Sequence, residues 1–71
     1  MIDNQFIQQK LEQAYEGIQV SVTGDGSHFA LEASGPMFEG LSRIKQQQLI
    51  YSILNDQIKD GSIHALTIKI V

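Results

Sequence analysis

The sequence predicts an α+β fold in which helices cover one face of a three-stranded mixed sheet. Two segments repeat apolar residues at helical spacing, three segments alternate apolar and polar residues with a period of two, and glycines or a proline stand at the junctions. The chain has 71 residues, so we expect a single domain over residues 1–71.

The first helix is predicted over residues 3–16. Ile7, Leu11 and Tyr15 recur at helical spacing and form one apolar stripe. Asp3 or Asn4 can cap the start, because either side chain accepts hydrogen bonds from the free N–H groups of a first turn.

A β-hairpin is predicted next. Residues 18–23 and 28–33 alternate apolar and polar side chains, as half-buried strands do. The glycine-rich segment 24–26 between them tolerates positive φ, which favours a tight antiparallel turn. The alternation directs Phe29 toward the core and His28 toward solvent.

A longer helix and a last strand follow. Pro36 ends the second strand, because proline has no N–H group to donate to a sheet. Ser42 caps a helix over residues 42–59, and the pattern is compatible with one continuous helix or with two shorter ones. Gly61 ends this region, and the last strand is predicted over residues 62–70.

The topology bears on the only two histidines of the chain. A helical connection between the second and third strands favours a parallel pair, whose N-terminal ends lie together. His28 begins the second strand and His64 is the third residue of the last, so we expect them to meet at one end of the sheet. By alternation His64 shares a face with Leu66, which places it at the core edge and on the opposite face from His28. The alternative to a functional role is that His28 is an ordinary surface residue at a strand start and that His64 is a core-edge residue with a satisfied hydrogen bond.

The composition of the chain excludes some classes of functional site and disfavours others. The chain has no cysteine, which excludes disulfides, zinc–thiolate sites and a cysteine nucleophile. The net charge of −3 with only five basic residues disfavours nucleic-acid binding. No catalytic motif is recognisable, so we expect no enzymatic activity. The absence of a long apolar run and of a signal-peptide pattern predicts a soluble cytoplasmic protein without membrane association.

Three segments together resemble the BolA family: Gly24-Asp25-Gly26-Ser27-His28-Phe29, Met37-Phe38-Glu39-Gly40 and Ile63-His64-Ala65-Leu66. Arg43-Ile44-Lys45-Gln46-Gln47 followed by Ile50-Tyr51 is similar to the IbaG-type branch. The resemblance covers nearly the whole chain. It implies an α-β-β-α-α-β order similar to a class II KH domain, with the last two strands parallel.

The resemblance also implies a function. Proteins of this family pair with monothiol glutaredoxins and share a bridging two-iron two-sulfur cluster. The matching ligand here is His64, and the second candidate is His28 or, less favoured, Asp25 or Ser27. Because this chain offers imidazole and no thiolate, the sulfur ligands would come from the glutaredoxin cysteine and glutathione. Imidazole can be protonated, so we expect the complex to lose its cluster as the pH falls.

Other functions remain open at this level. The family resemblance also allows a nucleic-acid-binding transcriptional regulator, for which Asp25, Ser27, Arg43 and Lys45 are the weak surface candidates. A metal-free protein-interaction domain and a homodimer are further possibilities. By residue type alone, Asp25 suits a turn and Arg43 and Lys45 suit a solvated helix face.

Overall fold

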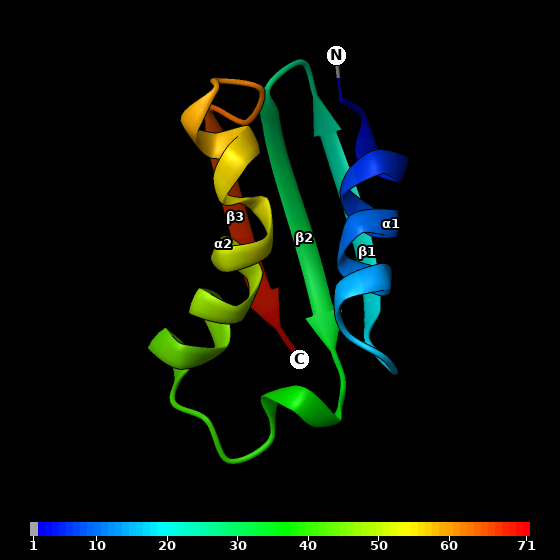
Figure 1. Cartoon of the computed structure of the whole chain (residues 1–71), viewed down its shortest axis with the longest axis vertical. Helices are drawn as coiled ribbons and strands as arrows, with labels where there is room; N and C mark the ends of the chain where they lie inside the picture. The colour runs from blue at the N-terminus through cyan, green and yellow to red at the C-terminus, as the bar shows by residue number, and fades with distance from the viewer. Residues whose placement is uncertain (1) are drawn as a thin grey trace.

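The computed structural model describes residues 2–71 and confirms the α+β class (Figure 1). Strands β1 and β2 are antiparallel, β2 and β3 are parallel, and β2 is central in the sheet. The elements, in chain order, are α1 (Asn4–Ala14), β1 (Gln19–Asp25), β2 (His28–Ser34), the 3₁₀ helix η1 (Pro36–Phe38), α2 (Arg43–Lys59) and β3 (Ala65–Ile70).

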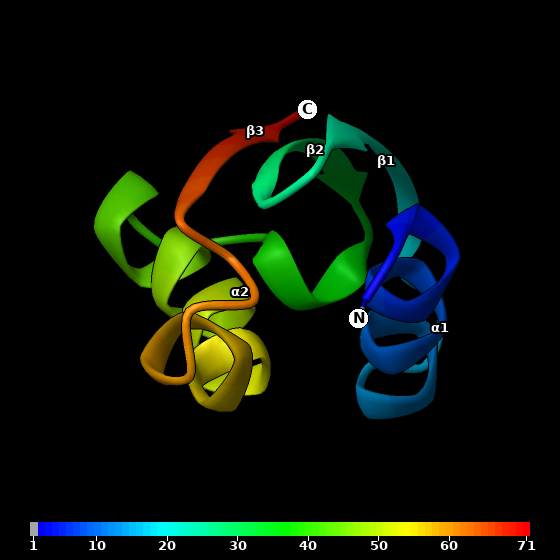
Figure 2. The same cartoon turned by 90° about the horizontal axis from the view of Figure 1, so that it is seen from above.

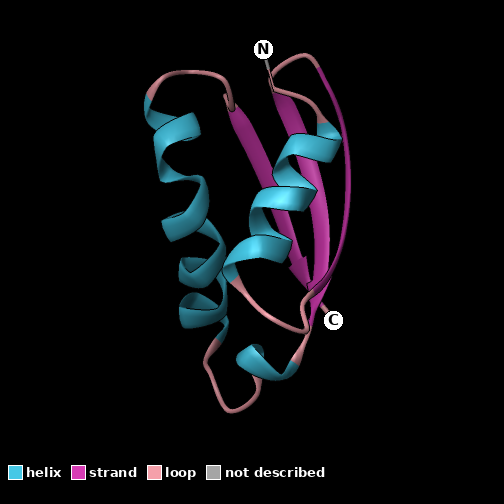
Figure 3. Cartoon of the chain, turned by 45° about the vertical axis from the view of Figure 1, so that its right-hand side comes forward, coloured by secondary structure: helices cyan, strands magenta, loops and turns pink. Residues whose placement is uncertain are grey.

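Both α-helices lie on one face of the curved sheet (Figures 2 and 3). The Tyr15 hydroxyl donates to the Leu49 carbonyl over 2.7 Å, and the Lys10 ammonium donates to the Gln57 side chain over 2.9 Å. These two bonds join α1 to α2. The helix layer therefore leaves the opposite face of the sheet open.

The predicted caps are present. The Phe6 N–H donates to Asp3 Oδ1 over 2.8 Å, and the Lys45 N–H donates to Ser42 Oγ over 3.3 Å. Helix α2 is continuous, and the short η1 supplies the additional helical segment between β2 and β3. The Gln46 side chain donates to the Phe38 carbonyl over 3.0 Å and ties η1 to α2.

The core lies between the helices and the sheet. Every predicted apolar stripe contributes to it, because each stripe faces the same interior. Phe29 points inward as predicted, while His28 is exposed. The buried residues are Ile7, Leu11, Ile18, Val22, Phe29, Leu31, Ala33, Phe38, Ile50, Leu54 and Ile63.

The start of the last strand differs from the prediction. Strand β3 begins at Ala65, and residues 60–64 cross from the end of α2 to the sheet. In this crossing the Ile63 N–H donates to the Gln57 carbonyl over 3.0 Å, and its side chain is buried. Strand alternation does not extend back through a crossing segment. The core-edge position predicted for His64 is therefore wrong, and His64 is exposed.

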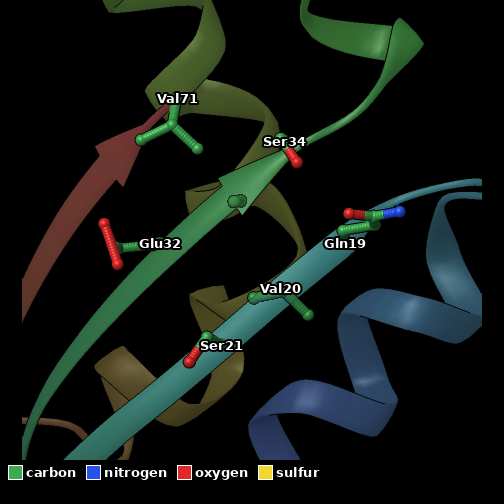
Figure 4. A pocket seen from close by; sticks show the side chains of 7 residues that line it. Gln19, Val20, Ser21, Glu32, Ser34 and Val71 are labelled. Atoms are coloured by element: carbon green, nitrogen blue, oxygen red, sulfur yellow. The ribbon is translucent and has the colours of Figure 1, made fainter.

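The open sheet face carries a shallow hollow of about 240 Å³ (Figure 4). It lies where β1 begins and β2 ends, since Gln19 pairs with Ser34 in the sheet register. Its lining residues are Gln19, Val20, Ser21, Glu32, Ala33, Ser34 and Val71. This hollow is at the opposite end of the sheet from both histidines.

Candidate metal-ligand site

The two histidines lie at the same end of the sheet, beside the β1–β2 turn. His28 pairs with Asp25 in β1 and with Ala65 in β3. The His64 and Ala65 N–H groups both donate to the Ser27 carbonyl, over 2.8 Å and 3.3 Å. The parallel pairing of β2 and β3 thus brings together residues from distant parts of the chain, as the topology predicted.

The His64 side chain has one defined partner. Its Nδ1 lies 3.2 Å from Ser27 Oγ. If Nδ1 carries the ring proton and donates it to the hydroxyl, the Nε2 lone pair is free to bind a metal. Both histidine side chains are exposed, so neither is buried in the core. The arrangement leaves the His64 ring accessible at the surface.

Residues 60–64, which connect α2 to β3 and contain His64, include a turn stabilised by a hydrogen bond. The Ser62 N–H donates to Asp60 Oδ1 over 2.8 Å. Hydrogen bonds from the Ser62 side chain and backbone lower the pKa of Asp60 below its ordinary value. The carboxylate therefore stays ionised and fixes the turn that ends α2.

A second hollow lies beside Ser27. It has a volume of about 410 Å³, and its lining residues are Ile2, Gly26, Ser27, Asp60, Gly61 and Ser62. Small side chains and backbone groups form most of its wall. Ser27 lines this hollow, whereas neither histidine does.

The remaining predicted residues divide between the two ends of the molecule. Asp25 and Ser27 lie at the histidine end, whereas Arg43 and Lys45 lie in the first turn of α2 at the other end (Figure 1). They do not form one surface. Sequence reasoning missed the contact between Ser27 and His64, although the parallel register implies it, because each residue directly precedes its own strand.

The side chains available as metal ligands limit which metal group this chain could bind. Within residues 2–71, no three side chains of the His, Cys, Asp and Glu types converge as metal ligands. The two imidazoles can supply some ligands of a cluster that also accepts nitrogen. The residues present fit a metal group whose other ligands come from a second molecule.

The fold and site define a small α+β domain that presents histidines at one end of a mixed sheet. Residues 4–71 match the family model described as BolA-like protein, and the chain belongs to the BolA-like family. It is 46% identical over 68 residues to the acid stress protein IbaG of Escherichia coli K12, a match that covers 96% of this chain and 81% of that protein. The predicted resemblance is confirmed.

A further sequence relative and two solved BolA structures are similar to this chain over most of its length. An uncharacterised protein of Haemophilus influenzae is 40% identical over 65 residues, covering 92% of this chain and 76% of the relative. A BolA homologue of Coxiella burnetii superposes with a TM-score of 0.84 at 32% identity, covering 99% of this chain and 90% of that chain. The BolA domain of Arabidopsis thaliana SufE1 gives 0.83 at 31% identity, covering 94% and 87%.

The two α-helices were compared with the requirements for crossing a membrane. Among residues 2–71, neither helix combines the length and the apolar composition that a transmembrane span requires.

Proposed function

We propose that this protein is a non-enzymatic iron–sulfur adaptor. It binds a monothiol glutaredoxin, and the two proteins share a bridging two-iron two-sulfur cluster as cargo. His64 is the main ligand from this chain and His28 is the second candidate. The glutaredoxin cysteine and glutathione provide the thiolate ligands, which this chain lacks.

The observation that carries the proposal is the pose of His64. The ring is exposed, its main-chain N–H is anchored to the Ser27 carbonyl, and its Nδ1 faces the Ser27 hydroxyl. A metal-binding histidine commonly uses its second ring nitrogen in this way, because the bond fixes the tautomer and the ring orientation. A histidine used only for core packing would instead be buried.

The test is a spectroscopic titration. The pure chain is mixed with a cluster-loaded monothiol glutaredoxin and glutathione, and visible absorption and circular dichroism are recorded. We expect a new cluster spectrum for the native chain and its loss for His64→Ala. The same spectrum recorded for His28→Ala shows whether His28 is a ligand.

Folding is followed separately by far-ultraviolet circular dichroism. Because both histidine side chains are exposed, each alanine variant should fold as the native chain does. An unaltered spectrum with folded His64→Ala would refute the assignment of His64. No spectral change with the native chain would leave a metal-free interaction domain as the function.

A further inference from the structure

The tripeptide Asp-Gly-Ser occurs twice in the chain, at residues 25–27 and 60–62. The first copy lies at the tip of the β1–β2 hairpin, and the second lies where α2 ends (Figure 1). In an Asp-Gly pair the glycine backbone nitrogen can attack the aspartate carboxyl group, because glycine has no side chain to hinder the approach. The two copies share this reactive sequence, so any difference between them comes from the fold.

The reaction rearranges the main chain at the aspartate without changing the mass of the protein. The glycine nitrogen bonds to Cγ of the carboxyl group, and its proton leaves with the carboxyl hydroxyl as water. The product is a five-membered succinimide ring. Water then adds to one of the two ring carbonyl carbons, and the C–N bond at that carbon breaks. Addition at Cγ restores aspartate, whereas addition at the main-chain carbonyl carbon leaves the chain linked through Cγ, as isoaspartate.

Hydrogen bonds occupy both reacting groups in the second copy. The Ser62 N–H donates to Asp60 Oδ1 over 2.8 Å. The Gly61 N–H donates to the Ile58 carbonyl over 3.4 Å, and the Asp60 N–H donates back into α2. Attack at this position requires the carboxyl group to leave Ser62 and the glycine nitrogen to leave Ile58. The turn that ends α2 therefore protects Asp60.

The corresponding groups of the first copy have no partners. Among residues 2–71, no hydrogen bond reaches the Asp25 carboxylate, and the Gly26 N–H has no acceptor. Both residues are exposed, and a Cβ at Gly26 would meet nothing within 4 Å. Asp25 pairs with His28 in the last pair before the turn, and the end of a ladder opens more readily than its interior. The rotation that attack requires therefore disturbs only this pair.

We infer that Asp25 is the position at which the folded chain forms isoaspartate, and that Asp60 is protected. The new linkage adds one carbon to the main chain at the hairpin tip. The pair of Asp25 with His28 cannot keep its register around a longer turn. The Ser27 carbonyl, which accepts the His64 N–H, is displaced with it. The modification acts on the histidine end of the molecule, and it does not depend on the proposed function.

The experiment compares the two positions in one sample. The native chain is incubated at neutral pH and digested, and isoaspartate in each peptide is measured by methyl transfer with an isoaspartyl methyltransferase. We expect isoaspartate at Asp25 and about tenfold less or lower still at Asp60, because two hydrogen bonds must open there first. The same incubation in concentrated urea removes the fold. There the two positions should react to a similar extent.

Two matched substitutions give a second readout. Asparagine closes the same ring with release of ammonia, so its reaction is followed by the mass gained when the amide becomes a carboxyl group. Asp25→Asn should deamidate about tenfold faster than Asp60→Asn in the folded chain, since the amide oxygen at position 60 can still accept the Ser62 N–H. Far-ultraviolet circular dichroism confirms that both variants are folded before incubation.

Three outcomes would overturn the inference. The first is equal isoaspartate at the two positions of the folded chain, or more at Asp60. The second is reaction at both positions in urea and at neither in the folded chain, which would show that the hairpin tip is protected as well. The third is a preference for Asp25 that persists unchanged in urea, which would assign the difference to the residues that precede each tripeptide, Gly24 and Lys59.

Discussion

Ser27 contacts His64 through both backbone and side chain. Its carbonyl accepts the His64 N–H and its hydroxyl lies 3.2 Å from Nδ1, so one residue fixes the position and the ring orientation of the other. Only the hydroxyl contact depends on the identity of residue 27. The two contributions can therefore be separated by substitution.

Ser27→Ala should keep the fold and release the ring. We expect the His64 ring nitrogens to show a different tautomer distribution by ¹⁵N NMR in the metal-free chain. Loss of a hydrogen-bond partner to a metal ligand typically weakens metal binding about 10- to 100-fold, so under the proposed function the affinity for the cluster should fall to a similar extent. Ser27→Thr keeps a hydroxyl and should restore both properties. Unchanged ¹⁵N signals in Ser27→Ala would show that the contact does not orient the ring.

Asp60 supplies a prediction about pH. Its pKa in the folded chain lies below the ordinary 3.8 because of the Ser62 hydrogen bonds. The turn is therefore fully stabilised above pH 3.8, and this stabilisation is lost as the pH falls through the lowered pKa. Ser62→Ala should raise the pKa of Asp60 toward its ordinary value, as measured by NMR titration of the carboxyl carbon. Ser34→Ala, on the far end of the sheet, is the control and should leave this pKa in place.

At the scale of elements, alternation predicted the strands wherever one face is buried. Phe29 and Leu31 of β2 are buried as expected, because the period of two matches a sheet covered on one side. The same rule failed at residues 62–64, which cross from helix to sheet and follow no strand geometry. The topology brought His64 to the correct end of the sheet, but its exposure depends on Ile63 taking the core position. Sequence spacing alone does not encode that choice.

The β1–β2 hairpin depends on close approach at Gly24. A Cβ at this position would lie 2.6 Å from the His28 carbonyl oxygen, a backbone atom of the facing strand. Gly24→Ala should therefore separate the strands and destabilise the fold by roughly 1–3 kcal/mol, as overpacking commonly does. Urea unfolding measures this, with the exposed Thr23→Ala as control. Equal stabilities of the two variants would show that the hairpin relaxes freely around residue 24.

At the scale of the whole molecule, the core is small and each member matters. A chain of 71 residues is expected to have a free energy of unfolding of roughly 4–10 kcal/mol. Leu54 is fully buried between the helices and the sheet, and Leu54→Ala should cost about 2–5 kcal/mol, leaving the domain at the limit of stability. Ile44→Ala removes a largely exposed side chain and should change the stability by less than about 0.5 kcal/mol. Thermal unfolding of both variants tests this contrast, and similar melting temperatures would contradict it.

The parallel pairing of β2 and β3 also has a consequence for biosynthesis. Ser27 and His64 are 37 residues apart in the chain, and they meet only when the last strand docks against β2. A nascent chain in which β3 has not yet docked against β2 would lack the contact between Ser27 and His64. Under the proposed function, a chain truncated before β3 would therefore not bind the cluster, even with the β1–β2 hairpin sequence intact.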